Sequence, residues 1–388
     1  MTSPHIASST VTQSNSTPPT RLAFVDGLRG FAILLVLCRH YYVELYTPTL
    51  PRWADGLSLG YLGVHLFLVV SGFCIAWPYV GATPRPFAFR NFWQRRASRI
   101  LPAYYVALAL ALVLALPMSP AAFWWQTITH LTMTHNFFAT TVLALNGPFW
   151  SLALECQLYL LFPLFLAGFR RFGIFTTLFV VGIIQLMARV LIAARFGTEY
   201  SDLTFVLPWS VVGRMLEFAL GMWVATVLKV GNRTLATAWW RSLLPLLTLC
   251  FAAAAIIAKR QLGVTAPLTD LFWSCSFLTL FFGASVPHTW LNQLFSWPPL
   301  VGLGVISYSV YLVHEFLLGR ITDAIRHLQV EPLAILAGLV PAILLTIFCC
   351  CGFYYLVERP AQWYFTTHRS QRNAGIGNQL LIEKSLNK

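Results

Sequence analysis

Apolar runs long enough to cross a bilayer recur along most of the chain. A spanning helix needs about 20 mostly apolar residues, and about ten segments of this kind alternate with short polar stretches. They cover residues 24–43, 58–80, 101–117, 148–168, 172–195, 205–228, 241–258, 268–286, 300–321 and 333–357. The pattern predicts an all-α, polytopic membrane protein with about ten transmembrane helices.

One further apolar stretch, residues 118–147, has interrupted flanks. Pro117 and Pro120 stand at its start, and an Asn-Gly-Pro sequence closes it at residues 146–148. Because these residues break helices, the stretch is predicted to be a long loop with an interfacial or re-entrant helix. An eleventh span is the alternative. Within it, His130, His135 and Asn136 are candidates for contacts with a substrate.

The two ends of the chain differ from the apolar middle. Residues 1–20 are rich in Ser, Thr and Pro and contain no long apolar core, so they predict a disordered cytoplasmic tail and no cleavable signal peptide. Residues 361–388 form a basic segment, predicted to be a second cytoplasmic tail. Residues 21–360 are predicted to form one membrane domain.

Composition supports the membrane assignment. Hydrophobic residues make up 57% of the chain and charged residues 10%, against about 45–50% apolar residues in a soluble domain. The net charge of +13 is spread over loops between the apolar runs, mostly alternate ones, which fits cytoplasmic termini under the positive-inside rule. A basic stripe for nucleic acid is not indicated. The cysteines fall in apolar runs without CxxC spacing, so no metal site is predicted.

A few ionisable residues fall inside the predicted spans, where each needs a partner or a function. They are Arg29, His40, Glu155, Arg189, Arg214, Glu217, His314 and Glu315.

Arg29 and His40 share one face of the first predicted helix. Eleven residues at about 100° each bring His40 to within roughly 20° of Arg29, about 16 Å further along the axis. A snorkelling arginine and an interfacial histidine would be the simple explanation. Glu155 and His314 are predicted at a depth similar to that of His40, so the three side chains are expected to converge in the outer half of the membrane. Glu155 could instead serve helix packing, paired with Arg189 or Arg214.

The strongest basic cluster is "RPFAFRNFWQRRASRILPAYY", predicted to be a cytoplasmic loop. Interleaved aromatic and basic residues suit a segment that lies on anionic lipid. Arginine forks also bind phosphate oxygens, so an anion site is the alternative.

Several stretches together resemble the integral membrane acyltransferase family 3. They are "FVDGLRGFAILLVLCRH" with its Arg-x10-His spacing, "GVHLFLVVSGFCI", "RRASRILPAYY", "PFWSLALECQLYLLFPL", "RMLEFALGM", "GVISYSVYLVH" and "VERP", in the order of the family and across residues 24–360. The resemblance implies a bacterial inner- or plasma-membrane enzyme that takes an acyl group, expected to be acetyl, from cytoplasmic acyl-CoA. The implied acceptor is an extracytoplasmic glycan or lipid-linked sugar.

The resemblance also assigns roles to residues. Arg29 and His40 match the essential pair of the family, and Glu155 matches its acid on the fourth helix. Arg96 and Arg99 match its cytoplasmic basic motif, and these two residues together with Arg95 are expected to bind the donor. The residues expected to support them are Glu44, one helical turn after His40, and Ser71, Arg214, Glu217, Tyr308 and His314.

His40 is accordingly expected to act as general base on an acceptor hydroxyl, with Glu155 or Glu44 orienting its ring. An acyl-histidine intermediate and direct attack on the thioester are both compatible with these residues. The expected function is O-acylation of a carbohydrate such as exopolysaccharide, O-antigen or glycolipid. The alternatives are a small hydrophobic acceptor of macrolide or lipid type, and a transporter whose path the buried charges line.

Overall fold

The structure, a computed structural model, describes residues 22–45, 50–196, 207–230, 238–262, 267–327, 336–365 and 367. Regular secondary structure in these residues is entirely helical. The predicted tail at 1–20, and the predicted tail at 361–388 beyond residue 367, lie outside the described residues.

The long helices follow the predicted apolar runs. They are α1 (Ala23–Leu45), α2 (Leu62–Ala76), α3 (Phe89–Leu114), α5 (Phe149–Arg171), α6 (Ile174–Phe196), α8 (Val211–Val230), α9 (Ala238–Leu262), α10 (Pro267–Ser285), α12 (Pro298–His327) and α14 (Leu339–Phe353). Short 3-10 helices flank α2 at Arg52–Tyr61 and Trp77–Tyr79, and α14 runs into a π-helical turn at Tyr354–Glu358.

Within the described residues, nine helices are long and apolar enough to cross a membrane. Helix α1 has 23 residues, which is sufficient length, but it carries four charged side chains: Asp26, Arg29, Arg39 and Glu44. The all-α polytopic fold is thus confirmed. The cytoplasmic placement of the termini stays a prediction.

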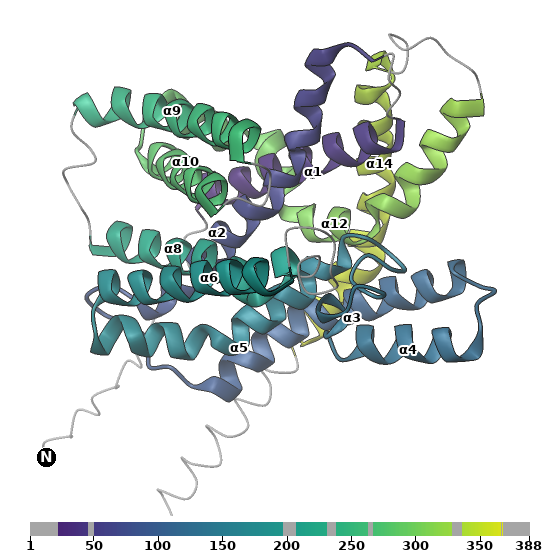
Figure 1. Ribbon diagram of the computed structural model, residues 1–388, viewed down its shortest axis with the longest axis horizontal. Helices are drawn as coiled ribbons and strands as arrows, with labels where there is room; N and C mark the ends of the chain where they lie inside the picture. The colour runs from purple at the N-terminus through teal and green to yellow at the C-terminus, as the bar shows by residue number, and fades with distance from the viewer. Residues whose placement is uncertain are drawn as a thin grey trace, which may run out of the picture.

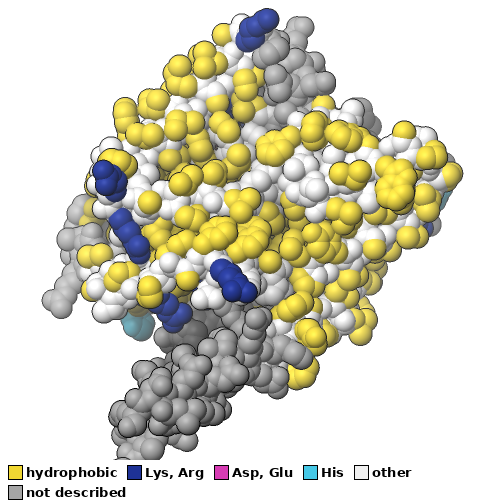
Figure 2. Space-filling view, turned by 90° about the horizontal axis from the view of Figure 1, so that it is seen from below, with side chains coloured by type: hydrophobic (Ala, Val, Ile, Leu, Met, Phe, Trp, Pro, Cys, Tyr) yellow, Lys and Arg dark blue, Asp and Glu magenta, His cyan; other side chains and the backbone are white. Residues whose placement is uncertain are grey.

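The outer surface of the bundle is apolar, as a lipid-facing surface must be. Phe175 on α6 is 76% exposed, Phe348 on α14 is 75% exposed and Leu356 is 80% exposed. Figure 2 shows a face on which hydrophobic side chains dominate, with Lys and Arg gathered mainly along one side. Exposed apolar patches of this extent are rare on soluble monomers and suit contact with acyl chains.

Three close helix pairs organise the bundle: α1 with α12, α2 with α8, and α9 with α10. Figure 1 shows α9 and α10 side by side, with α5, α6 and α8 below them and α3 and α4 on the other side of the molecule.

Glycines allow α1 and α12 to approach closely. A Cβ at Gly30 would lie 2.1 Å from the Leu300 carbonyl oxygen, and one at Gly304 would lie 1.8 Å from the Asp26 carbonyl oxygen. Small residues at such contacts are the usual means of close packing in membranes. This contact fixes α12 against the helix that carries Arg29 and His40.

The basic segment before residue 101 is helical, which corrects its prediction as a loop. Helix α3 begins at Phe89 and therefore includes Arg95, Arg96 and Arg99. Hydropathy marked only the apolar part of this helix, because the helical backbone continues into a charged first half that a hydropathy window excludes. The arginines are thus presented on a rigid element.

Residues 118–147 form the predicted loop with a short helix. Helix α4 (Pro120–Leu131) has 12 residues, or about 18 Å, too short to span a bilayer. Ser119 caps it by accepting from the Ala122 amide at 3.3 Å. The loop is anchored to α12 because the Asn146 side chain donates to the Leu312 carbonyl at 2.8 Å.

The three candidate residues of this loop are buried, so none of them is exposed at the surface. His130 and His135, here called the stacked histidines, are 0% exposed, and Asn136 is likewise 0% exposed. The two imidazole rings lie parallel with centroids 4.0 Å apart. Burial lowers the pKa of His130 to about 4 and that of His135 to about 3, because an imidazolium loses hydration there.

Candidate active site

A cavity of about 120 Å³ lies between α1, α2, α3, α5 and α12. Three arginines line it: Arg29 from α1, and Arg96 and Arg99 from α3. Arg96 and Arg99 are three residues apart on a helix and therefore neighbours on one face. Arg99 is exposed, whereas Arg29 and Arg96 are partly buried. The cationic part of the cavity thus reaches the surface at Arg99.

Glu155 on α5 faces the same cavity. Its carboxylate accepts hydrogen bonds from the Ser71 hydroxyl, at 2.6 Å, and from the Tyr159 hydroxyl. It also lies within electrostatic range of Arg29 and Arg96. One carboxylate therefore offsets part of the charge of the arginines, and the lining keeps a positive excess.

Two further contacts hold α12 at the cavity. The Tyr308 hydroxyl donates to the Ile100 carbonyl on α3 at 2.8 Å. Ser309 donates to the carboxylate of Glu358 in the π-helical turn, and Glu358 is within electrostatic range of Arg99 and Arg29. The "VERP" motif thus supplies a second acid near the arginines.

The cavity also reaches two buried hydroxyls, those of Ser151 and Tyr311. The Ser151 hydroxyl donates to the Tyr311 hydroxyl at 2.7 Å, which joins α5 to α12. The Tyr311 ring lies 5.9 Å, between centroids, from the His314 ring. Tyr311 therefore contacts the His314 ring and also lines the cavity.

His40 and His314, here called the histidine pair, lie against each other, and neither lines the cavity. Their rings are perpendicular, with centroids 4.9 Å apart. His314 is fully buried, and its Nδ1 lies 3.0 Å from the carbonyl oxygens of both Val310 and Tyr311. His40 is only partly buried. Sequence reasoning placed both histidines at one depth, and the structure brings them together.

Glu155 does not join this pair, contrary to the predicted convergence. It bonds Ser71 and Tyr159 and shares the cavity with Arg29. The prediction estimated the depth of Glu155 by counting residues from the end of its helix. That count does not give a common depth, because the helices do not end at the same distance from these residues. Helix α12 extends to His327, well past His314, whereas α5 begins only six residues before Glu155.

Two other predicted residues lie apart from the cavity. Arg95 donates to the Tyr79 hydroxyl at 2.7 Å and is absent from the cavity lining. Glu44 follows His40 by one turn of α1, is partly buried and lies within electrostatic range of Glu315. The donor-binding role of Arg95 and the orienting role of Glu44 stay predictions.

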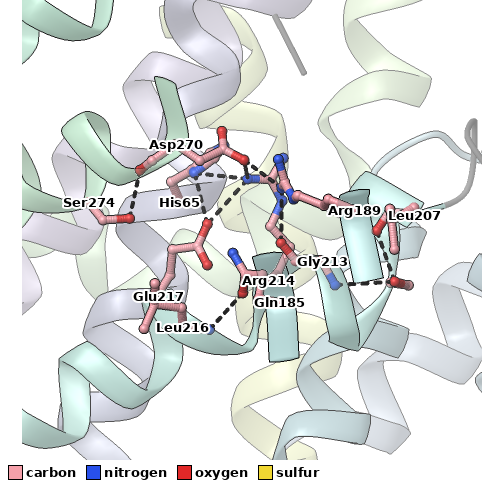
Figure 3. A network of polar contacts seen from close by, with 11 residues as sticks. His65, Gln185, Arg189, Leu207, Gly213, Arg214, Leu216, Glu217, Asp270 and Ser274 are labelled. Carbon is pink, nitrogen blue, oxygen red and sulfur yellow. Dashed lines mark hydrogen bonds and ion pairs between the residues drawn. The ribbon is translucent and has the colours of Figure 1, made fainter. Parts of the chain in front are cut away.

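Figure 3 shows a separate buried ionic network, formed by His65 from α2, Arg189 from α6, Arg214 and Glu217 from α8, and Asp270 from α10. Asp270 bridges Arg189 at 2.5 Å and Arg214 at 3.3 Å. Glu217 bridges Arg214 at 3.2 Å and approaches His65 at 3.4 Å. None of the five lines the cavity.

This network corrects the suggested pairing of Glu155 with Arg189 or Arg214, because Asp270 pairs with both arginines. Two acids and two arginines balance in charge, which is how membrane interiors tolerate such groups. The network ties four helices together. The expected supporting role of Arg214 and Glu217 in catalysis stays a prediction.

Sequence reasoning missed several of these residues. His65 and Asp270 fall inside the predicted spans 58–80 and 268–286, so they belonged with the other ionisable residues that need a partner or a function in the membrane. Tyr159 lies one helical turn after Glu155, which places it on the same face. Ser151 and Tyr311 carried no signal, because their contact joins residues 160 apart in sequence.

Among the described residues, no group of three or more His, Cys, Asp or Glu side chains is placed to hold a metal ion. A cavity lined by three arginines, and a histidine pair further along the same α1 helix, lie within a polytopic helical bundle of membrane-spanning length.

The sequence comparisons identify the family. Residues 22–355 match the acyltransferase domain of the acyltransferase 3 family, and the chain belongs to that family. It is therefore an integral membrane acyltransferase, and the transporter alternative is set aside.

Two relatives illustrate the similarity. O-acetyltransferase OatA of Staphylococcus aureus (strain NCTC 8325 / PS 47) is 27% identical over 324 residues, which cover 76% of this chain and 50% of that protein. Acyltransferase MdmB of Streptomyces mycarofaciens is 28% identical over 329 residues, which cover 76% of this chain and 79% of that protein. The chain thus matches about half the length of the first relative. No solved structure matches the chain.

Proposed function

We propose that the protein transfers an acyl group, acetyl in the first instance, from cytoplasmic acyl-CoA to a hydroxyl group of an extracytoplasmic carbohydrate. The observation that carries the proposal is the arrangement along α1. Arg29 lines a cationic cavity and His40 belongs to the histidine pair, about 16 Å further along the same helix.

The arginines suit the donor. Coenzyme A is a long thioester with phosphate groups at one end, and arginine forks bind phosphate oxygens in bidentate geometry. Arg99 and Arg96 would hold these phosphates, and Arg29 would hold the arm that continues into the cavity. Glu155 accepts hydrogen bonds from two hydroxyls and offsets part of the positive charge, so the arginines keep a positive excess for the phosphates.

The histidine pair suits the acceptor. His40 takes the proton of an acceptor hydroxyl as its oxygen attacks the thioester carbonyl carbon. The C–O ester bond forms, the C–S bond breaks, and the sulfur leaves with the bonding electrons and receives the proton. If a transient acyl-histidine forms, the acyl group moves first from the thioester to His40 and then from His40 to the acceptor hydroxyl.

The relatives support this direction. The name of the S. aureus relative, O-acetyltransferase, supports acetyl as the transferred group and oxygen as the accepting atom. The S. mycarofaciens relative, named an acyltransferase, has similar identity and a better-matched length. Its name does not specify an acceptor, so a small hydrophobic acceptor, of macrolide or lipid type, stays the second candidate.

A deletion strain tests both acceptors. Mass spectrometry of released surface glycans compares the parent, a strain without the gene, and the deletion strain complemented with wild type or His40→Ala. We expect O-acetyl esters that disappear on deletion, return with wild type and stay absent with His40→Ala. His288→Asn is the control, since His288 is an exposed histidine that does not line the cavity. Unchanged glycans with altered lipophilic metabolites would support the second acceptor, and no change in either would sink the proposal.

A further inference from the structure

His314 has one ring nitrogen whose state is fixed by the backbone. Both neighbours of its Nδ1, the carbonyl oxygens of Val310 and Tyr311 at 3.0 Å, are acceptors only. Nδ1 must therefore carry the hydrogen. In the neutral ring, Nε2 then carries a lone pair and can only accept.

That lone pair is buried without a partner among the described residues. Nε2 of His314 is inaccessible to solvent and makes no hydrogen bond there. Buried acceptors are satisfied in most proteins, so an unsatisfied one needs an explanation. The ring beside it is His40, 4.9 Å away between centroids, which the proposed function makes the general base.

His314 is fully buried, whereas His40 is only partly buried. His314 is 0% exposed, and α12 is fixed to the loop at its side by the bond from Asn146 to Leu312. His40 is partly exposed and lies at the junction of α1 and α12. A hydrogen bond between the two rings requires the His40 ring to turn about its Cβ–Cγ bond until one N–H points at His314 Nε2.

We propose that His314 is a positioning residue that accepts the N–H of His40, so that the other nitrogen of His40 faces the acceptor hydroxyl. The inference rests on the proposed function. When His40 takes the hydroxyl proton, its positive charge is shared with His314 through this bond. After the C–S bond breaks, the proton passes from His40 to the CoA sulfur, and both rings return to neutral.

The two hydrogen-bonding ends of His314 can be tested separately. In His314→Asn, the amide can replace the Nδ1 bond to the backbone but leaves no acceptor at the place of Nε2. In His314→Gln, the longer side chain can put an amide oxygen there as acceptor, although it cannot take a proton. A purely structural role predicts that Asn preserves activity, whereas positioning predicts that Gln preserves more of it.

The assay uses inside-out vesicles supplied with labelled acetyl-CoA, and measures transfer to endogenous acceptor per molecule of folded protein. We expect His314→Ala and His314→Asn to lower kcat by about 10- to 100-fold, part of the contribution of a general base. His314→Gln should lose less. The KM for acetyl-CoA should change less than about twofold, because His314 does not line the cavity. His288→Asn serves as control.

A second measurement shows whether His314 acts through His40. In a His40→Ala background, His314→Asn should cause no further loss, because residues that act as a unit are not additive. Additive losses, or wild-type kcat in His314→Asn, would overturn this inference while leaving the proposed function intact. Full transfer by His40→Ala would instead overturn the proposed role of His40, which separates the two failures. If His314→Ala does not fold, the Gln variant and the paired backgrounds still decide.

Discussion

The contact between α1 and α12 predicts a severe effect from one added methyl group at Gly304. In Gly304→Ala, the new Cβ would lie 1.8 Å from the Asp26 carbonyl oxygen, whereas ordinary contact begins at 3.4 Å. The obstacle is backbone, so it cannot move aside as a flexible side chain would. The two helices must separate locally by about 1.6 Å, and overpacking of this kind costs about 1–3 kcal/mol.

The same helix contains a matched control. A Cβ at Gly302 would meet nothing within 4 Å, so Gly302→Ala should gain up to about 1 kcal/mol from helix propensity. We therefore expect the two variants to differ by about 2 kcal/mol or more in stability. The measurement is the fraction of detergent-solubilised protein that stays monodisperse after heating.

Activity should separate the variants further. Helix α1 carries Arg29 and His40, and α12 carries Tyr308 and His314, so separation of the helices misaligns the cavity and the histidine pair. A displacement of about 1 Å can cost about 100-fold in rate. Gly304→Ala that is as stable and as active as Gly302→Ala would refute the claim that this contact sets the site geometry.

Three more predictions follow from the charges and the loop. Asp270→Asn leaves two buried arginines without their shared carboxylate and should destabilise the fold by about 3–5 kcal/mol, measured by the same heating assay. Asp55 is exposed, so Asp55→Asn should change the stability little. Arg99→Ala should raise the KM for acetyl-CoA by roughly 10-fold or more through loss of a charge-assisted hydrogen bond. Arg90 is exposed and does not line the cavity, so Arg90→Ala should leave this KM unchanged. An equal rise in KM in both variants would count against the donor site. Burial keeps the stacked histidines neutral in the folded protein down to about pH 4 or below, whereas in the unfolded chain they take up protons as the pH falls through about 6.5. Their contribution to stability is therefore complete above about pH 6.5 and is lost as the pH falls towards 4 and 3. Replacing both histidines with Gln should flatten this pH dependence in thermal melts from pH 4 to 7.

The positions of the helices could be predicted from the sequence because their signal is local. An apolar run of about 20 residues specifies a spanning helix whatever lies elsewhere in the chain. The errors arose where a helix contains charged residues, because hydropathy then no longer marks the helical segment. The first half of α3 is charged yet helical, so the arginines at 95–99 appeared as a loop in the apolar pattern.

Part of the candidate site was equally local. Arg29 and His40 lie on one continuous helix, Ala23–Leu45, so their shared face and spacing follow from helix geometry alone. Glu155 could not be placed in this way. Its partner Ser71 is 84 residues away in sequence, and no periodicity within either helix encodes which neighbour each face meets.

The sequence by itself determined a polytopic helical membrane protein, the face that Arg29 and His40 share, and the resemblance to acyltransferases. Only the tertiary structure decided which charges meet: Glu155 with Ser71 and Tyr159, Asp270 with Arg189 and Arg214, and His40 with His314. The physical reason is that a helix fixes the angle and rise between its own residues, whereas its tilt, rotation and neighbours depend on close contacts such as that of Gly304 with the backbone of α1.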